Sequence, residues 1–321
     1  MFGRRSTPIP VVKELDFPGC VSREFPELFP IAWEAVETAR SALTQADDLT
    51  PLERHSPGLR GFDWASYLRL SVIRMLHAQQ TLVSAGVRSG RILDLGSYLG
   101  NFALMFARFG YQTDALDSYR AYGAATEPTV NAMRTAGINV LDFEEVGFEL
   151  TGMPPDSYDA VACMGVIEHV PHTPRPLLRA VNRVLKPGGV LVLDTPNLGY
   201  LYNRQKLQRG ESIFCPIELQ FETEIPFEGH HREYTPREVS WMLDRVGYEV
   251  VGLETFNYSL FGLSEITGAD LENYETMAMQ PDCREIILVG ARRPPARAIF
   301  GYWATWCAEQ AKKALRGERW A

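Results

Sequence analysis

The residues best suited to chemistry begin with two glycines and an aspartate in the segment 91–119. An apolar run ends at Gly96, Gly100 follows it, and Asp117 lies roughly 20 residues beyond Gly96. A turn without bulky side chains lets backbone N–H groups approach a ligand, and a carboxylate on the next strand can accept hydrogen bonds from both ribose hydroxyls. We therefore expect a nucleotide-type ligand here. An ordinary strand–helix–strand turn in the core is the alternative.

A second group of residues could move a proton. Glu168 and His169 follow an apolar run, and His230 and His231 lie together in a later loop. The ordinary pKa of an imidazole, near 6.5, suits a general base at neutral pH. His230 or His231 is the candidate base. The alternatives are that one histidine only fixes its loop to a carboxylate, and that Glu168 and His169 only cap the start of a helix.

The composition excludes several classes of protein. The chain has 321 residues, a net charge of −8 and no block of lysine and arginine, which disfavours a nucleic-acid substrate. Its five cysteines contain no CxxC pair, so a disulfide framework or a zinc site is not expected. No apolar run approaches the ~20 residues that span a bilayer, and no signal peptide is apparent. We expect a cytoplasmic protein with reduced thiols.

Strands and helices alternate from residue 91 onward, in an order that would position these residues. Strands are expected at 91–95, 112–117, 138–142, 158–164, 190–194, 248–255 and 285–291, and helices at 100–109, 124–136, 174–184 and 236–246. Short apolar strands alternating with helices indicate a parallel sheet covered on both faces. Ligands of such sheets bind at the carboxyl ends of the strands. Gly96, Asp117, Asp142 and Met164 all lie at these ends.

Other segments do not fit the repeating unit. Residues 195–234 and 256–283 are too long for simple connections and rich in aromatic side chains, so we interpret them as lids over a site. Residues 1–87 are expected to form an N-terminal extension, irregular over 1–30 and helical over 31–46 and 64–83. Residues 295–321 are expected to form an amphipathic C-terminal helix that docks on a partner subunit or on its own domain. Membrane attachment through it is possible but disfavoured.

Five sequence pieces carry a family resemblance. They are ILDLGSYLG at 92–100, ALD at 115–117, DSYDAVACMGVIEHV at 156–170, LLRAVNRVLKPGGVLVLDTPN at 177–197 and HREYTPREVSWMLDRVGYEV at 231–250. In this order they resemble the class I S-adenosylmethionine-dependent methyltransferases, especially the small-molecule, ubiquinone-pathway-like O-methyltransferases. The resemblance covers residues 88–294. It implies a doubly wound α/β fold with a mostly parallel, seven-stranded, Rossmann-like sheet.

The resemblance also implies roles for individual residues. Asp117 would hold the cofactor's ribose, Asp142 and Phe143 would lie by its adenine, and Met164 would line the sulfonium side. The remaining implied cofactor-binding residues are Asp94, Gly96, Ser97, Tyr98, Gly100 and Ser118.

Two positions depart from the family. Tyr98 stands where a glycine is common in the turn. Gly165 stands where ubiquinone-pathway relatives have the first of two glutamates that, with a histidine, bind magnesium. No metal site is therefore expected, since Mg²⁺ usually requires several oxygen ligands.

We interpret the chain as an S-adenosylmethionine-dependent methyltransferase. It would O-methylate a small-molecule or glycan-type acceptor and release S-adenosylhomocysteine. One alternative is a non-catalytic cofactor-binding or scaffold protein on the same fold. Another is a nicotinamide-dependent oxidoreductase, which the LKPGG turn at 185–189 disfavours. The sequence leaves a homo-oligomer possible.

Overall fold

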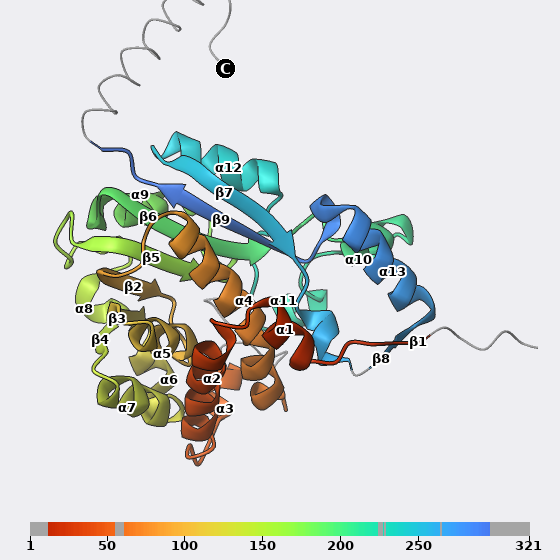
Figure 1. The fold of residues 1–321 in the computed structure, drawn as a ribbon, viewed down its shortest axis with the longest axis horizontal. Helices are drawn as coiled ribbons and strands as arrows, with labels where there is room; N and C mark the ends of the chain where they lie inside the picture. Colours follow the sequence, from red (N-terminus) through yellow and green to blue (C-terminus); the bar gives the residue numbers. More distant parts are fainter. Residues whose placement is uncertain (1–11, 55–60, 224–226, 228, 264, 296–321) are drawn as a thin grey trace, which may run out of the picture.

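The computed structural model describes residues 12–54, 61–223, 227, 229–263 and 265–295. A seven-stranded sheet in the order β4-β3-β2-β5-β6-β9-β7 forms its centre (Figure 1). The strands are β2 (Arg91–Leu95), β3 (Gln112–Asp117), β4 (Asn139–Asp142), β5 (Tyr158–Met164), β6 (Leu185–Pro196), β7 (Glu249–Phe256) and β9 (Ile286–Arg292). Adjacent strands from β4 to β6 pair in parallel, whereas β9 is antiparallel to both of its neighbours. The expected α/β, mostly parallel, seven-stranded fold is confirmed.

Each face of the sheet carries its own hydrophobic core, because successive side chains of a strand point to opposite faces. Ile92 belongs to one core and its neighbour Leu93 to the other. On the Ile92 face pack α2 (Phe29–Leu43), α4 (Trp64–Ser84), α5 (Asn101–Arg108) and α7 (Glu127–Thr135). On the Leu93 face pack α9 (Arg175–Val184) and α12 (Pro236–Arg245). Figure 1 shows α9 and α12 on the side of the sheet opposite α2 and α4.

Local capping fixes where two of these helices begin. Asp63 Oδ1 accepts a hydrogen bond of 3.0 Å from the Ser66 backbone N–H at the start of α4. Thr235 and Glu238 form a reciprocal capping box at the start of α12. Both caps place the following helix directly after a loop that borders the site.

The N-terminal extension is more regular than expected. The prediction that residues 1–30 are irregular was wrong for β1 (Val12–Glu14) and α1 (Gly19–Glu24). β1 pairs antiparallel with β8 (Glu265–Thr267), which lies in the second insertion. The extension also contains the short helix α3 (Thr50–Arg54). Two further short helices, α6 (Tyr119–Tyr122) and α8 (Phe143–Val146), follow β3 and β4. The C-terminal helix proposed for 295–321 falls outside the described residues, apart from residue 295.

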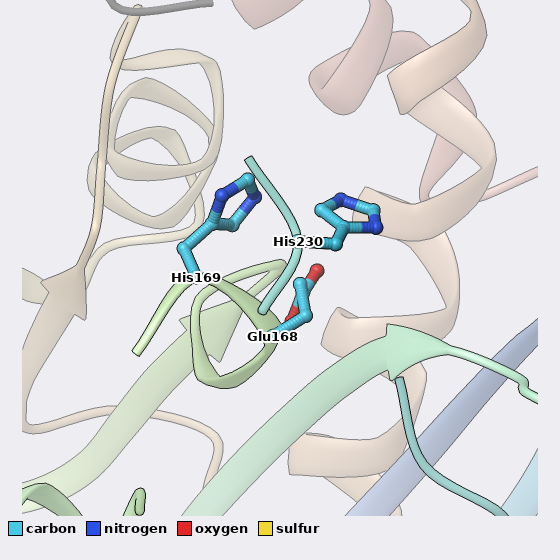
Figure 2. A group of neighbouring side chains, drawn as sticks. All are labelled: Glu168, His169 and His230. Carbon is cyan, nitrogen blue, oxygen red and sulfur yellow. The ribbon is translucent and has the colours of Figure 1, made fainter. Parts of the chain in front are cut away.

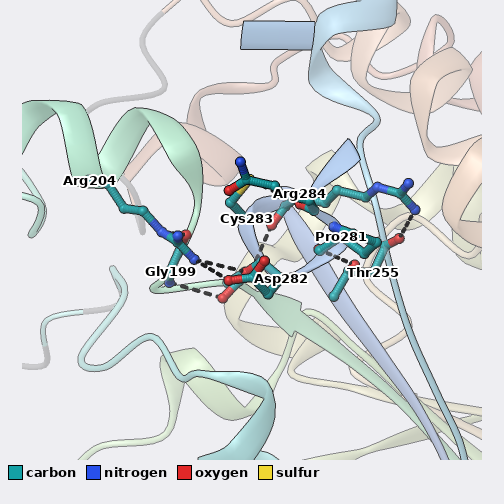
Figure 3. A network of polar contacts seen from close by, with 9 residues as sticks. Gly199, Arg204, Thr255, Pro281, Asp282, Cys283 and Arg284 are labelled. Carbon is teal, nitrogen blue, oxygen red and sulfur yellow. Dashed lines mark hydrogen bonds and ion pairs between the residues drawn. The ribbon is translucent and has the colours of Figure 1, made fainter. Parts of the chain in front are cut away.

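The two insertions contain structure of their own. The first holds α10 (Leu201–Gln208) and α11 (Ile217–Glu222); the second holds β8 and α13 (Gly268–Met279), with the short 3₁₀ turns η4 (Ser259–Gly262) and η5 (Pro281–Cys283). Polar contacts tie the insertions together (Figure 3). Asn197 Nδ2 donates to the backbone oxygens of Asp282 and Arg284 at 2.9 and 2.8 Å, and Arg204 pairs with Asp282 at 2.8 Å. Within the described residues, no helix is both long and apolar enough to cross a membrane.

Candidate active site

The turn between β2 and α5 is the first component of the site. Gly96 has φ +76°, and a Cβ there would collide with Val166, so only glycine fits. Tyr98 also has positive φ, at 45°. Its backbone N–H donates to Asp117 Oδ2 at 2.7 Å, and the Ser118 N–H donates to Asp117 Oδ1 at 2.7 Å. Asp117 thereby braces the turn from the end of the adjacent strand.

Buried carboxylates gather at this end of the sheet. Asp94 is 1% exposed, and its Oδ2 has no hydrogen-bond partner among the described residues. Burial and the charge of Asp117 raise the pKa of Asp94 to about 8, and burial raises the pKa of Asp117 to about 6. The Asp142 carboxylate accepts hydrogen bonds from the Arg120 and Glu144 backbone N–H groups, both at 2.9 Å. Since burial disfavours these charges, a ligand with hydroxyl donors or positive charge would stabilise them.

A cavity of about 750 Å³ opens over the carboxyl ends of the strands. Nine of the residues predicted from sequence border it: Gly96, Ser97, Tyr98, Asp117, Phe143, Met164, Glu168, His169 and His230. Five others lie outside its lining: Asp94, Gly100, Ser118, Asp142 and His231. Residues from α4 and from both insertions complete the wall. The cavity is thus formed jointly by the sheet, the N-terminal extension and the two insertions.

Glu168, His169 and His230 converge on one side of this cavity (Figure 2). Each offers a ligand atom, and these atoms lie within 4.8 Å of one another. Glu168 is 2% exposed and accepts a hydrogen bond of 2.9 Å from the Thr195 hydroxyl. Burial raises the pKa of Glu168 to about 7, although the nearby His230 partly offsets this effect. A donor set of two imidazoles and a single carboxylate does not match the oxygen ligands that Mg²⁺ prefers.

The two neighbouring histidines have different environments. His230 Nδ1 lies 3.0 Å from Glu233 Oε1, and Asn203 Nδ2 donates to Glu233 Oε2 at 3.4 Å. Burial alone would lower the pKa of His230, but the hydrogen bond to Glu233 and the charges of Glu168 and Glu233 raise it overall. His231, in contrast, lies with Nε2 2.9 Å from the Phe227 backbone oxygen. Of the two candidate bases, only His230 borders the cavity.

A buried ion pair borders the cavity close to Glu168. Arg74 Nε and Nη2 donate to the two Asp194 oxygens at 2.8 and 2.7 Å, and both side chains are buried. Gly165, with φ +69°, separates this pair from Glu168. A Cβ at Gly165 would lie 2.8 Å from Arg74 Nη2, so a glutamate would not fit here without movement of the arginine.

Sequence reasoning missed Arg74 as a residue of the site, and it missed the role of Glu233. The spacing of Glu233 three residues after His230 was visible in the sequence, but nothing distinguished it from an ordinary loop carboxylate. Arg74 is separated from Asp194 by 120 residues, and no local pattern joins them.

Comparisons with known proteins agree on one family. The model of the family described as "Methyltransferase domain" matches residues 67–253. A ubiquinone biosynthesis O-methyltransferase of Xanthomonas oryzae pv. oryzae is 35% identical over 135 residues, which are 40% of this chain and 51% of the relative. That of Xanthomonas axonopodis pv. citri is 33% identical over 129 residues, with the same coverage. The chain thus spans about half the length of the curated relatives it matches.

Solved structures show a more distant similarity. A putative sarcosine dimethylglycine methyltransferase from Galdieria sulphuraria is 18% identical, with a TM-score of 0.47, and the match covers 71% of this chain and 88% of that one.

Proposed function

This chain belongs to the class I S-adenosylmethionine-dependent methyltransferases, and from that premise we propose that it methylates a hydroxyl group of a small acceptor. The cofactor is S-adenosylmethionine, which supplies an activated methyl group when bound. O-methylation is consistent with the names of the ubiquinone-pathway relatives. The observation that carries the proposal is the His230–Glu233 pair at the wall of the cavity.

The residues present suit the cofactor. Asp117 would accept the ribose hydroxyls through the lone pairs that its two backbone donors leave free. Asp94 holds a buried oxygen without a partner in the described part of the chain, two residues before Gly96 at the cavity wall. Phe143 and Met164 would supply apolar contacts.

His230 would act as the general base. Glu233 accepts a hydrogen bond from Nδ1–H, which leaves Nε2 to take the proton of the acceptor hydroxyl. Glu168, buried beside His230, would stabilise the imidazolium that results. The lids would exclude water and hold the acceptor hydroxyl in line with the methyl group.

Two measurements test this proposal. S-adenosylhomocysteine should bind to the purified chain in a calorimetric titration, and labelled methyl groups should pass to a hydroxylated acceptor. His230→Ala should lower the transfer rate about 10²–10⁴-fold and leave S-adenosylhomocysteine binding intact. His231→Ala is the matched control, since His231 lies outside the lining. Binding without transfer to any acceptor would instead favour the non-catalytic alternative.

A further inference from the structure

Several polar groups at the cavity have no hydrogen-bond partner among the described residues. Arg74 uses Nε and Nη2 on Asp194, and its Nη1 has no hydrogen-bond acceptor among the described residues. The Tyr67 and Tyr258 hydroxyls, which also border the cavity, likewise form no hydrogen bond within the described ranges. Tyr67 and Arg74 are seven residues apart on α4, two helical turns, and so lie on one face.

A buried indole adds a further donor. Trp64 borders the cavity and is 5% exposed, and its Nε1–H has no acceptor in the part of the chain that the structure describes. A buried donor left without a partner destabilises the folded state. Such groups usually meet a ligand or an ordered water.

The charges around the cavity disfavour an anionic acceptor. The positive charge of Arg74 is already balanced by Asp194 at 2.7 Å. Among the described residues, three further acidic side chains, Asp117, Glu168 and Glu233, border the cavity, against a single lysine, Lys206. The free Arg74 Nη1 can therefore donate to an uncharged oxygen, whereas a second carboxylate would meet mostly negative neighbours.

Aromatic rings form the wall next to these donors. The rings of Trp64 and Tyr98 have centroids 5.8 Å apart, and those of Tyr98 and Tyr122 are 5.3 Å apart. Flat apolar faces beside many hydrogen-bonding groups suit a ring that is apolar on its faces and hydroxylated at its edge. A benzene diol has only two oxygens, and one of them would receive the methyl group. The other could not serve all four groups, which are Arg74 Nη1, the Tyr67 and Tyr258 hydroxyls and Trp64 Nε1.

Gly165 lies between Arg74 and Glu168, in a space too small for any side chain. The point where its Cβ would stand is 2.8 Å from Arg74 Nη2 and 3.5 Å from Glu168 Oε1. Glu168 in turn lies beside His230 (Figure 2). Arg74, Glu168 and His230 thus lie near one another on the cavity wall.

We propose that the acceptor is an uncharged sugar ring, whose non-reacting hydroxyls are bound by Arg74 Nη1, Tyr67 and Tyr258 and whose face packs on the aromatic wall. This inference rests on the proposed methyltransferase function and specifies its substrate class. Trp64 Nε1 would donate to a further ring oxygen.

Ligand-observed NMR on the chain saturated with S-adenosylhomocysteine tests this. The probes are the methyl α-glycosides of glucose, galactose, mannose and rhamnose, compared with glucuronate and catechol. At least one glycoside should bind at least about tenfold more tightly than glucuronate and catechol. Tyr67→Phe and Tyr258→Phe should each weaken glycoside binding about three- to tenfold without changing the affinity for S-adenosylhomocysteine. Tyr274→Phe, a tyrosine of α13 outside the cavity lining, is the matched control and should change neither.

Three results would overturn the inference: no glycoside binds although S-adenosylhomocysteine does, catechol or glucuronate binds best, or neither tyrosine variant weakens glycoside binding. Failure of S-adenosylhomocysteine to bind would instead count against the proposed function itself, so the two failures are distinguishable.

Discussion

His230 Nδ1 lies 3.0 Å from Glu233 Oε1, while Glu233 is itself held by Asn203 from helix α10. The imidazole is therefore oriented by a carboxylate that the first insertion fixes in place. Because Asn203 belongs to α10 and His230 follows α11, the position of the proposed base depends on how this insertion folds over the sheet.

Glu233→Gln should shift the pH dependence of methyl transfer. The pKa of His230 is raised above 6.5, so the imidazole remains protonated, and inactive as a base, to a higher pH. The rate should rise as pH increases through this raised pKa. Removing the Glu233 charge should move the rise to lower pH and, because the base is weaker, lower the plateau. A pH–rate profile measures both effects; Glu211→Gln, at an exposed ion pair with Arg209, should leave the profile unchanged.

Asp117→Ala should abolish most cofactor binding. Its carboxylate is the proposed acceptor for two ribose hydroxyls, and hydrogen bonds to charged groups contribute about 1.5–3 kcal/mol each. We expect S-adenosylhomocysteine affinity to fall at least about 100-fold in calorimetry. The variant also loses the brace on the Tyr98 backbone, so a circular dichroism spectrum should accompany the titration. Asp282→Ala serves as control, because the Asp282 carboxylate is exposed, pairs with Arg204 and lies outside the cavity lining. Unchanged affinity in Asp117→Ala would contradict this cofactor site.

Activity should survive removal of metal ions. Gly165 stands where the family resemblance implies the first carboxylate of a magnesium site, and Arg74 Nη2 lies 2.8 Å from where its Cβ would stand. The remaining Glu168, His169 and His230 offer a single carboxylate. We expect dialysis against EDTA to leave the methyl-transfer rate within about twofold, because Mg²⁺ favours oxygen ligands. Loss of activity that Mg²⁺ or another divalent ion restores would show that this prediction is wrong.

Gly165→Ala should destabilise the fold more than Gly188→Ala. Both glycines have positive φ, +69° and +86°, which costs other residues about 1–2 kcal/mol. Only at Gly165 would the new Cβ also meet a buried guanidinium; at Gly188 nothing lies within 4 Å. We expect losses in the free energy of unfolding of about 2–4 and 1–2 kcal/mol respectively, measured by urea denaturation. Equal losses would mean that Arg74 moves aside without cost.

The sheet could be predicted from the sequence because its strands are apolar runs, and both their lengths and the turn residues that bound them are local properties. Asp117 was predictable for the same reason, since its distance from Gly96 follows from one strand–helix–strand unit. The pairing of β1 with β8 was not predictable, because it joins Val12 to Thr267 across most of the chain and neither strand exceeds three residues. The Arg74–Asp194 pair was not predicted for the same reason, because its two residues lie 120 positions apart in the chain.

The sequence alone could not decide whether His230 or His231 is the better candidate for the general base. The two adjacent histidines offer identical chemistry in the sequence. Their difference arises only when the loop folds so that the Phe227 carbonyl lies 2.9 Å from His231 and Glu233 lies beside His230.

Asn197→Ala should loosen the lids more than Arg204→Ala. Asn197 is 1% exposed. Its Nδ2 donates to the backbone oxygens of Asp282 and Arg284 at 2.9 and 2.8 Å, and its Oδ1 accepts from the Gly199 N–H at 2.9 Å. Alanine would leave these buried groups unpaired, at a cost of about 2–4 kcal/mol. Arg204 pairs with Asp282 where both side chains are largely exposed, so its loss should cost at most about 1 kcal/mol.

Limited proteolysis can compare the two variants, because the segment 209–216 between α10 and α11 is largely exposed and becomes a better protease substrate when the insertion loosens. Asn197→Ala should be cleaved there several times faster than the unmodified chain, and Arg204→Ala only slightly faster. Since Asn197 anchors the insertion that carries His230 and Asn203, the KM for acceptor should also rise in Asn197→Ala while S-adenosylhomocysteine affinity stays within about twofold. If Arg204→Ala equalled Asn197→Ala in both assays, the exposed ion pair and not the buried amide would be the anchor of the lids.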